Sequence, residues 1–201
     1  LFPYTTLFRS RMTDVIQVLG QKLHADDFFH PARLGRRMYY KMFGGAHLVN
    51  RAGLARTFQN IRLFREMSVV ENLLVAQHQH LKSGVFAGLL KTPAFRRAEA
   101  EALTHAAEWL ERVGLLEMAN RSAGNLAYGQ QRRLEIARCM VTRPELLMLD
   151  EPAAGLNPKE TDELDHLIVE LRDRHKVSVL LIEHDMKLVM GISDRIYVVN
   201  Q

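Results

Sequence analysis

The sequence predicts an α/β fold, with a mostly parallel sheet flanked by helices and a helical subdomain inserted into it. In residues 142–201, short apolar segments alternate with helical patterns, the order typical of an α/β layer architecture. In residues 67–141, only helical spacing of apolar residues is present. We therefore assign 67–141 to the helical subdomain and 142–201 to the C-terminal part of the sheet domain, with residues 46–66 preceding both.

Three short apolar segments predict strands of the sheet. They span residues 146–149, 177–182 and 195–200, and the last two are rich in β-branched residues. Strands of this composition suit a parallel sheet that is covered on both faces. The first of them ends directly in Asp150 and Glu151.

Three helices are predicted from apolar spacing and from signals at their ends. Residues 96–113 carry an apolar stripe, and Gly114 follows as a C-terminal stop. A second helix covers 130–141. The third has a strong start signal: a cap residue at Asn157, a proline in the first turn and Glu160 three residues after the cap.

Composition narrows the class of protein and its partners. The chain has 201 residues, 47% of them hydrophobic, and one cysteine, Cys139, which excludes a disulfide framework within one chain and fits a reducing cytosol. No apolar run approaches the roughly 18 residues of a membrane span. The net charge of +4 arises wholly in residues 1–50, while residues 51–201 hold 20 basic and 20 acidic residues. We therefore expect no nucleic-acid partner.

Residues 1–45 differ from the rest of the chain. Eight of the 15 aromatic residues lie before residue 46, and neither helical nor alternating apolar spacing persists there. We interpret the opening LFPYTTLFRS as a sequence-assembly scar and residues 11–45 as a frame-shifted translation, which leaves the N-terminal lobe incomplete. The alternative is a genuine but divergent lobe.

The carboxylates of Asp150 and Glu151 follow an apolar strand, which places them at the sheet edge where α/β proteins bind ligands. In a phosphate-cleaving site the first acid holds Mg²⁺ and the second activates the attacking water. By itself the pattern is only moderately specific, because two solvated acids at a strand end would look the same.

Three further motifs are weak when each is taken alone. The segment 126–130 (Leu-Ala-Tyr-Gly-Gln) opens the predicted helix 130–141, and a helix N-terminus favours anions, although an ordinary glycine turn is the simpler interpretation. His184 follows a strand and is placed to donate to a γ-phosphate, but single loop histidines are more often structural. Gln59 suits a position near Mg²⁺, but most glutamines are surface residues.

Together, the five motifs resemble the ABC ATPases. Gln59, 126–130, Asp150-Glu151, 154–157 and His184 stand in the order of the Q-loop, signature, Walker B, D-loop and H-loop of that family. The resemblance implies a P-loop NTPase fold of the ABC ATPase type, with ATP as substrate and Mg²⁺ as cofactor.

Four longer segments resemble one subfamily, the ATP-binding subunits of bacterial high-affinity branched-chain amino acid importers. They are RTFQNIRLFREMSVVENLLVAQHQ, NLAYGQQRRLEIARCM, LLMLDEPAAGLNPKET and LLIEHDMKLVMGISDRIYVVNQ, within residues 46–201. The resemblance implies two cassettes, identical or different, paired head to tail beneath two membrane permeases, with a periplasmic binding protein acting indirectly. It implies a position on the cytoplasmic side of the inner membrane and uptake of leucine, isoleucine or valine.

Roles follow from the resemblance position by position. Asp150 would hold Mg²⁺ together with Gln59, Glu151 would activate water, and His184 would contact the γ-phosphate. Gln59 would also sense that phosphate and relay its state to the permease. Leu126, Ala127, Tyr128, Gly129 and Gln130 would close on the ATP of the partner cassette, as would Asn157 in the D-loop.

Two departures from the family pattern matter. Ala127 and Tyr128 stand where the signature usually has Ser and Gly, so a hydroxyl contact is missing. The phosphate-binding loop Gly-x4-Gly-Lys-Ser/Thr is missing too, since none of the seven lysines follows a glycine. We therefore expect a truncated or chimeric form of a complete enzyme, which binds ATP poorly by itself.

Two other functions stay open. The first is a non-catalytic ABC module that contributes only its signature contacts to a competent partner. The second is a non-transport ABC ATPase acting in DNA repair or on ribosomes, but the chain has neither the long coiled coil nor the second cassette typical of those proteins.

Overall fold

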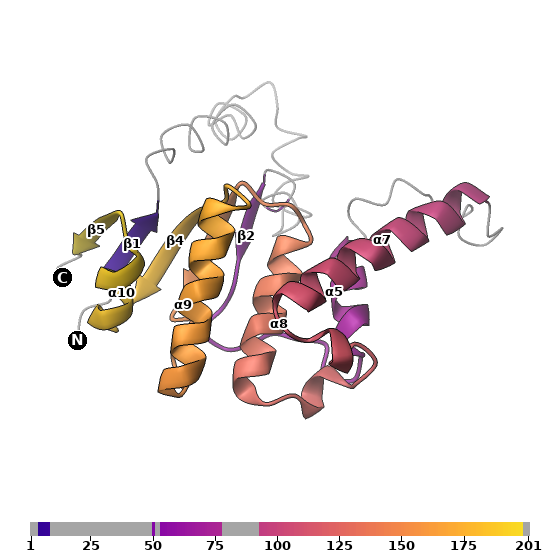
Figure 1. Ribbon diagram of the computed structural model, residues 1–201, viewed down its shortest axis with the longest axis horizontal. Coiled ribbons are helices and arrows are strands. Elements are labelled where there is room, and N and C mark those ends of the chain that lie inside the picture. Colours follow the sequence, from indigo (N-terminus) through magenta and orange to yellow (C-terminus); the bar gives the residue numbers. More distant parts are fainter. Residues whose placement is uncertain (1–3, 9–49, 51–52, 78–92, 199–201) are drawn as a thin grey trace, which may run out of the picture. The chain divides into compact units, whose positions relative to one another are not determined.

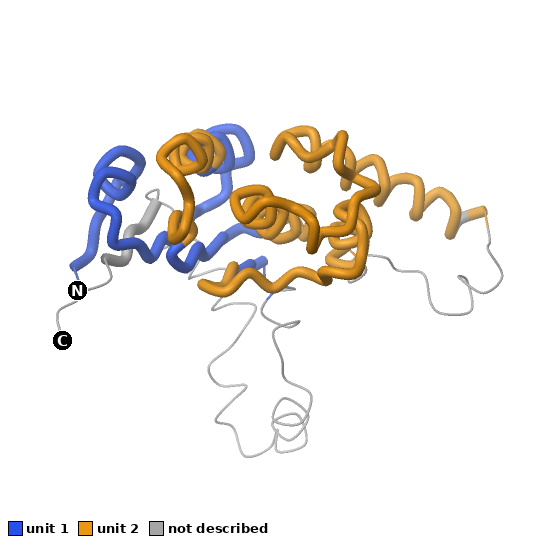
Figure 2. The backbone as a smooth tube through the Cα atoms, turned by 90° about the horizontal axis from the view of Figure 1, so that it is seen from below, with its two compact units in different colours: residues 1–56, 144–151, 168–201 blue, residues 57–143, 152–167 orange. Residues whose placement is uncertain are grey.

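The computed structural model describes residues 4–8, 50, 53–77 and 93–198. They form two compact units, one from residues 1–56, 144–151 and 168–201, and the other from 57–143 and 152–167 (Figure 2). The whole of the predicted frame-shifted segment 11–45, together with residues 199–200 of the last predicted strand, lies outside the described residues.

The first unit is built on a five-stranded sheet in the order β2-β3-β4-β1-β5 (Figure 1). The strands are β1 (Tyr4–Phe8), β2 (Leu54–Arg56), β3 (Leu146–Asp150), β4 (Ser178–Glu183) and β5 (Arg195–Val198). β2, β3 and β4 pair in parallel, whereas β1 is antiparallel to both β4 and β5. The three predicted strands and the mostly parallel sheet are confirmed, apart from β1.

Strand β1 lies within residues 1–45, which we had left out of the fold prediction. Tyr4–Phe8 pairs along its whole length with β4, with Thr6 opposite Leu181, and on its other side with β5. A strand between two neighbours gains its backbone hydrogen bonds from both of them and does not need alternating apolar residues. The β-branched and aromatic composition of YTTLF was the available signal.

The core of the first unit contains aliphatic side chains of β3 and β4. Leu147 and Leu149 of β3 and Val179 and Leu181 of β4 are buried. Helix α10 (Met186–Ile192) follows β4. Helix α9 (Pro158–Asp173) begins in the second unit and ends in the first, where the side chain of Leu171 is buried.

Among the described residues, three helices lie wholly within the second unit. They are α5 (Val69–Gln77), α7 (Pro93–Arg112) and α8 (Tyr128–Met140), with short 3₁₀ turns at Leu116–Met118 and Ala123–Asn125. All three pairs of these helices are in contact. Leu73, Leu110 and Leu134, one from each helix, are fully buried and form the centre of this unit.

The ends of the predicted helices have the expected physical causes. After α7, Gly114 adopts φ +67°, and the amides of Gly114 and Leu115 donate to the carbonyls of Glu111 and Leu110. This is a Schellman motif. At the start of α9, the amide of Glu160 donates to Asn157 Oδ1, and the amide of Asn157 donates to Glu160 Oε2, each at 3.0 Å. The predicted capping box is therefore confirmed.

Helix α5 has a start signal that we did not use. Ser68 and Glu71 form a second capping box, with the Ser68 amide 2.8 Å from Glu71 Oε2 and the Glu71 amide 3.3 Å from Ser68 Oγ. The Ser68 amide and the Ser68 hydroxyl both donate to Glu71 Oε2 and lower the pKa of Glu71. The Ser-x-x-Glu pattern alone predicts a helix beginning there.

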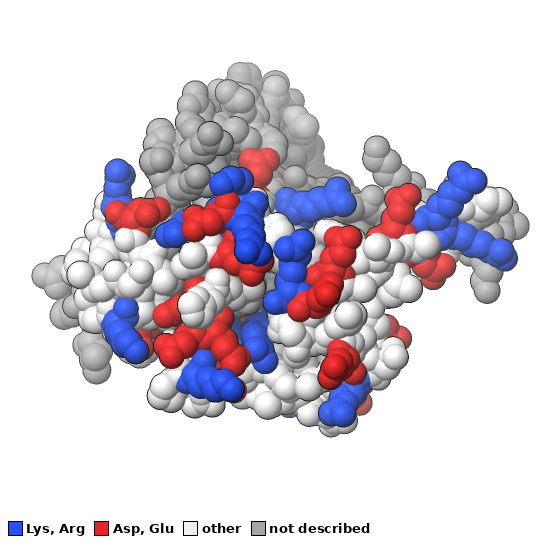
Figure 3. All heavy atoms as spheres, in the orientation of Figure 1, with Lys and Arg blue, Asp and Glu red and all other residues white. Residues whose placement is uncertain are grey.

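Residues 57–66 and 152–167 belong to the second unit together with the helical region predicted at 67–141. On the face drawn in Figure 3, basic and acidic side chains are interspersed. Ion pairs among the described residues include Arg133 with Glu163 and Arg174 with Glu170. Among the described helices, none combines the length and the apolar character that crossing a bilayer requires.

Candidate functional site

The carboxyl ends of β3 and β4 bring three of the predicted residues to one edge of the sheet. Asp150, the last residue of β3, lies opposite Ile182 of β4. The amide of Glu151 donates to the carbonyl of the same Ile182 at 2.8 Å. His184 follows two residues later. Asp150, Glu151 and His184 are therefore neighbours in this structure.

Asp150 is paired with a cation from the adjacent strand. The Nη2 atom of Arg56, at the end of β2, lies 2.8 Å from Asp150 Oδ2. Both side chains are partly exposed, at 47% and 24%. Solvent weakens such a pair to about 1 kcal/mol or less, so another cation can compete with Arg56 for this carboxylate.

Glu151 has an unusual backbone conformation. Its φ is +45°, in the left-handed region that residues with a Cβ atom seldom adopt. The hydrogen bond from its amide to Ile182 holds the chain in this turn. Backbone strain of this kind is common at functional sites, and here it turns the chain sharply just after Asp150.

The loop that carries His184 is organised by a buried acid that we had not predicted. Glu183, the last residue of β4, is 1% exposed, and its Oε2 accepts the amides of His184 at 2.9 Å and Asp185 at 3.3 Å. The imidazole Nδ1 lies 3.7 Å from the same oxygen, while the ring is 53% exposed. Asp185 then caps α10 by accepting the amides of Lys187 and Leu188. The side chain of His184 therefore projects toward solvent from a loop that hydrogen bonds to Glu183 and Asp185 organise.

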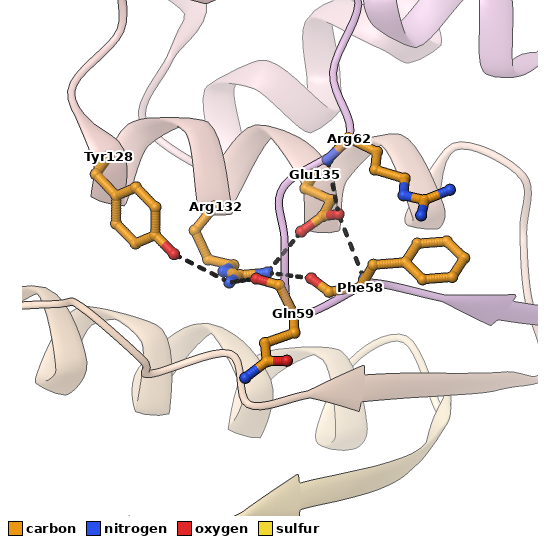
Figure 4. Close-up of polar contacts among 6 residues, drawn as sticks. All are labelled: Phe58, Gln59, Arg62, Tyr128, Arg132 and Glu135. Carbon is orange, nitrogen blue, oxygen red and sulfur yellow. Dashed lines mark hydrogen bonds and ion pairs between the residues drawn. The ribbon is translucent and has the colours of Figure 1, made fainter.

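Gln59 lies in the second unit, in an irregular segment that a buried arginine holds in place (Figure 4). Arg132 of α8 is fully buried. Its Nη1 donates to the carbonyl of Phe58 at 2.9 Å, and its Nη2 donates to the carbonyl of Gln59 at 3.0 Å. The position of the Gln59 backbone is thus set by a side chain 73 residues away in sequence.

Glu135 completes this buried group. Its Oε2 lies 2.8 Å from Arg132 Nη1, and its Oε1 accepts the amides of Phe58 and Arg62, each at 3.5 Å. Burial raises the pKa of Glu135, while Arg132 and the two amides oppose the rise. Neither of these charged residues was predicted from the sequence as part of the site. The indication that the sequence offers is that Arg132 and Glu135 lie three positions apart on a mostly buried helix, where their side chains can pair.

Segment 126–130 lies at the start of α8, as predicted. Leu126 is buried, and the amide of Ala127 donates to the Gln130 side chain at 3.1 Å. Ala127 is the N-cap residue and has no hydroxyl to accept the orphan amides of the first turn. The hydroxyl that the sequence lacks at position 127 is therefore also lacking as a cap at the start of α8.

Two glycines allow the D-loop segment to approach the start of α8. A Cβ atom added to Gly129 would lie 2.6 Å from the carboxyl carbon of Glu160, which is too close. A Cβ on Gly155 would lie 3.2 Å from Tyr128 Cε1, and Gly155 has φ +79°. Asn157 caps α9 through its side chain. Segments 126–130 and 154–160 are therefore packed together within the second unit.

The predicted residues thus fall into two groups. Asp150, Glu151 and His184 meet in the first unit, whereas Gln59, 126–130 and Asn157 belong to the second. Arg132 connects Gln59 to Tyr128, because its Nη2 donates to the Gln59 carbonyl and to the Tyr128 hydroxyl, the latter at 3.4 Å.

The first group, Asp150, Glu151 and His184, offers too few ligands to coordinate Mg²⁺ without phosphate oxygens. Within the described ranges, no group of three or more His, Cys, Asp or Glu side chains could hold a metal ion. Mg²⁺ does not need such a cage in phosphate-cleaving sites, where one or two carboxylates, water and substrate phosphates complete its coordination. Asp150, partly exposed at the strand end, is a carboxylate of this kind.

Comparison with known proteins then identifies the family. A family model described as "ABC transporter" matches residues 37–154, more than half of the chain. The chain belongs to this family. The match begins inside the segment 1–45 that we had set apart from the fold.

Other members of the ABC transporter family are very similar in sequence. Two are named "High-affinity branched-chain amino acid transport ATP-binding protein LivG". The Salmonella typhimurium protein is 78% identical over 153 residues, which are 76% of this chain and 60% of the relative. The Escherichia coli K12 protein is 70% identical over 176 residues, covering 81% and 69%. The Pseudomonas aeruginosa protein BraF, with the same descriptive name, is 72% identical over 155 residues, covering 77% and 61%.

Solved ABC structures share the fold. The ADP conformation of an ATP-binding cassette of an ABC transporter matches with a TM-score of 0.59 at 30% identity, covering 74% of this chain and 57% of that one. A post-hydrolysis dimeric cassette bound to ADP and Pi matches at 0.59 with 20% identity, covering 78% and 68%, which supports the fold alone. The P-loop NTPase fold of the ABC type is thus confirmed. The chain spans about 60% of the length of the Salmonella relatives that it matches.

Proposed function

We propose that this chain is part of an ATP-binding and ATP-hydrolysing subunit of an ABC importer, which couples hydrolysis to the uptake of branched-chain amino acids. The observation that carries the proposal is the identity of 70–78% to relatives named for that transport. The arrangement of Asp150, Glu151 and His184 on one sheet edge supports a phosphate-cleaving role.

Asp150 and Glu151 divide the chemistry between them. Asp150 would hold Mg²⁺ through coordinated water, with Gln59 as a further oxygen donor, and the metal would neutralise phosphate charge when bound. Glu151 would be the general base, which accepts a proton from the attacking water. The backbone of Glu151, with its positive φ, forms a tight turn that directs the chain away from β3. This turn fixes the backbone position from which the Glu151 side chain extends.

His184 and Gln59 act as contacts to the γ-phosphate. The buried Glu183 holds the His184 loop, so that the exposed imidazole is held ready to donate a hydrogen bond. Gln59, whose backbone Arg132 holds, would sense the same phosphate and signal to the permease.

Residues Leu126 to Gln130 would bind the ATP of a second cassette, as would Asn157. The free amides at the start of α8 attract anions, and the absence of a serine at position 127 leaves this task to the backbone. Two cassettes, identical or different, are thus required for two complete nucleotide sites.

Further partners follow from the proposed transport. Two transmembrane permeases would form the pathway, and a periplasmic amino acid binding protein would deliver the cargo to them. The chain would lie against the cytoplasmic side of the bacterial inner membrane. Cargo selection would belong to those partners, because none of the residues discussed above recognises an amino acid side chain.

The missing phosphate loop limits what residues 1–201 do alone. Its backbone amides and lysine supply most contacts to the β- and γ-phosphates in P-loop enzymes. We expect this polypeptide to bind ATP weakly. Titration of purified residues 1–201 with ATP tests this, and micromolar affinity with steady turnover would contradict it.

The Glu151→Gln variant of the protein encoded by the complete gene tests the proposed chemistry. Loss of the base should lower ATP turnover at least about 100-fold, since general-base catalysis contributes about that much, while the ATP-bound dimer accumulates. Turnover by phosphate release and dimerisation by size-exclusion chromatography are the measurements. Glu145→Gln, at an exposed acid before β3, is the control. Unchanged turnover in Glu151→Gln would assign the base elsewhere.

The missing Gly-Lys-Ser/Thr sequence favours one alternative, a non-catalytic module that lends its signature contacts to a competent partner. Sequencing the coding DNA upstream of Arg51 separates the two functions. An in-frame phosphate loop supports the ATPase, whereas an uninterrupted frame that encodes residues 1–50 as they stand supports the module.

A further inference from the structure

Residues 57–65 belong to neither a helix nor a strand, so their backbone groups need partners elsewhere. The α8 side chains supply four such contacts. Arg132 donates to the carbonyls of Phe58 and Gln59, and Glu135 accepts the amides of Phe58 and Arg62 (Figure 4). The segment that carries Gln59 is therefore held from inside the second unit by one charged pair.

Stability alone does not explain this pair. Arg132 and Glu135 have side chains that are 0% and 3% exposed, and taking two charges out of water costs about as much as their attraction returns. Apolar residues of similar size would fill the same space. A planar guanidinium, however, binds two carbonyls in one fixed geometry, which an apolar side chain does not do.

The same guanidinium also touches the start of α8. Arg132 Nη2 lies 3.4 Å from the Tyr128 hydroxyl, and Arg132 Cζ lies 6.0 Å from the centre of the Tyr128 ring. The same ring lies close to Gly155, where an added Cβ atom would lie 3.2 Å from Tyr128 Cε1. Arg132 therefore contacts both Gln59 and Tyr128, and the Tyr128 ring lies close to Gly155.

We propose that Arg132, supported by Glu135 and Tyr128, is a positioning residue that ties the Gln59 segment to the start of α8 and the loop at Gly155. The proposal rests on the function proposed above, in which Gln59 faces the ATP of its own cassette whereas 126–130 faces the ATP of the partner. Under that function, a shift of either loop is transmitted to the other nucleotide site through this guanidinium.

The first test measures hydrogen exchange of residues 57–62 in the 201-residue chain, without nucleotide. The double variant Arg132→Met/Glu135→Leu removes both charges and keeps the volume apolar, which avoids leaving one buried charge unpaired. Loss of the hydrogen bonds to charged groups should speed exchange of the Phe58 and Arg62 amides about tenfold. The matched control, Arg133→Met/Glu163→Leu, removes an ion pair that the next residue of α8 makes with α9. Equal exchange in both double variants would overturn the proposed tie.

Tyr128 tests the other end of the connection. It is 44% exposed, so its replacement leaves the core intact. Tyr128→Ala should speed exchange at 57–62 several-fold, whereas Tyr128→Phe, which keeps the ring against Gly155, should have a smaller effect. Tyr197→Ala, at an equally exposed tyrosine of β5, is the control. If residues 57–62 exchange no faster in Tyr128→Ala than in the control, Tyr128 does not support the Gln59 segment.

The second test uses the complete protein assembled with its permeases, and compares ATP hydrolysis with and without the transported amino acid. Arg132→Met/Glu135→Leu should lower this stimulation several-fold at an unchanged melting temperature, while Arg133→Met/Glu163→Leu retains it. Unchanged stimulation would show that the tie holds a loop without linking two sites, and would overturn the proposal. If the unsubstituted complex hydrolyses no ATP, the proposed function fails, and the exchange experiment still decides whether the tie exists.

Discussion

Buried charged side chains set the positions of the loops that carry the candidate site. Glu183 accepts two successive amides and thereby fixes the His184 loop, and Arg132 does the corresponding work for the Gln59 carbonyl. An unpaired buried charge is costly, so each of these residues is surrounded by several partners. Among the described residues, Arg132 Nε is an exception, since it is buried without a hydrogen-bond partner.

A neutral histidine connects α5 and α7. Trp109 Nε1 donates to His105 Nε2 at 3.2 Å, and His105 Nδ1 lies 3.3 Å from Gln77 Oε1. Because Nε2 accepts a hydrogen bond, the ring is in the neutral tautomer with its proton on Nδ1. Burial lowers the pKa of His105, and the positive charge of Arg143 lowers it further.

We predict that acid destabilises the chain through His105. Its pKa in the fold lies below the usual 6.5, so the unfolded chain binds more protons as the pH falls below about 6.5. The free energy of unfolding should therefore fall in that range and level off below the folded pKa. Urea unfolding at pH 7.5 and 5.5 measures the effect. His105→Gln should reduce this pH dependence, and the exposed His166→Asn should keep it. Equal pH dependence in all three proteins would contradict the assignment.

A second prediction concerns Gly129. An added Cβ atom would overlap the Glu160 carboxylate, which would have to leave its hydrogen bond to the Asn157 amide. The Gly129→Ala substitution should therefore cost about 1 kcal/mol more in the native chain than in the Glu160→Ala background, the typical value of a capping interaction. Urea unfolding of the four proteins of this cycle gives the difference. Additive free energies would show that the contact is absent.

At the scale of single elements, helix α8 has an incomplete N-terminus. Its N-cap residue Ala127 has extended backbone angles of −60° and 156°, suitable for a capping serine, but no acceptor atom. The Gln130 side chain satisfies the Ala127 amide, whereas the reverse bond of a capping box is missing. Helix α9 shows the complete arrangement with Asn157 and Glu160.

We predict that Ala127→Ser stabilises the chain by about 1 kcal/mol, because the new hydroxyl accepts an orphan amide of the first turn. Thermal unfolding followed by circular dichroism measures the gain as a rise in melting temperature. Ala127→Val, which adds similar volume without an acceptor, should bring no rise. A serine variant no more stable than the valine variant would show that position 127 does not cap α8.

At the scale of the whole molecule, the continuity of the sheet depends on β1. β5 pairs with β1, and β1 in turn pairs with β4. A proline at Thr6, which lies between Leu181 and Ile196, would remove a donor from this ladder.

We predict that Thr6→Pro lowers the free energy of unfolding by about 1–3 kcal/mol, the cost of leaving a backbone hydrogen bond of the sheet unmade. It should also speed hydrogen exchange at residues 195–198 of β5. The near-isosteric Thr6→Val, which suits a strand, should do neither. If Thr6→Pro exchanges like Thr6→Val at β5, β1 does not hold β5 in the sheet.

The elements that local patterns describe well were predicted correctly. The strand ending at Asp150, the α9 capping box and the Gly114 stop each depend on residues within a few positions of one another. Strand β1 was missed because its partners are about 175 residues away in sequence, as in the pairing of Thr6 with Leu181. No local pattern reports a pairing of that range.

The candidate site divides in the same way. The order of Gln59, 126–130, Asp150-Glu151 and His184 could be read from the chain, because each motif is a short run with its own chemistry. That Arg56 pairs with Asp150, and that Arg132 holds Gln59, could not.

The sequence by itself therefore determined the family and the α/β class, and it predicted the candidate site residues. Only the tertiary structure decided which charged residues are buried and which loops they hold. The physical reason is that burial and hydrogen-bond partnership belong to pairs of distant residues. A glutamate such as Glu183 looks the same in sequence whether it faces water or two backbone amides.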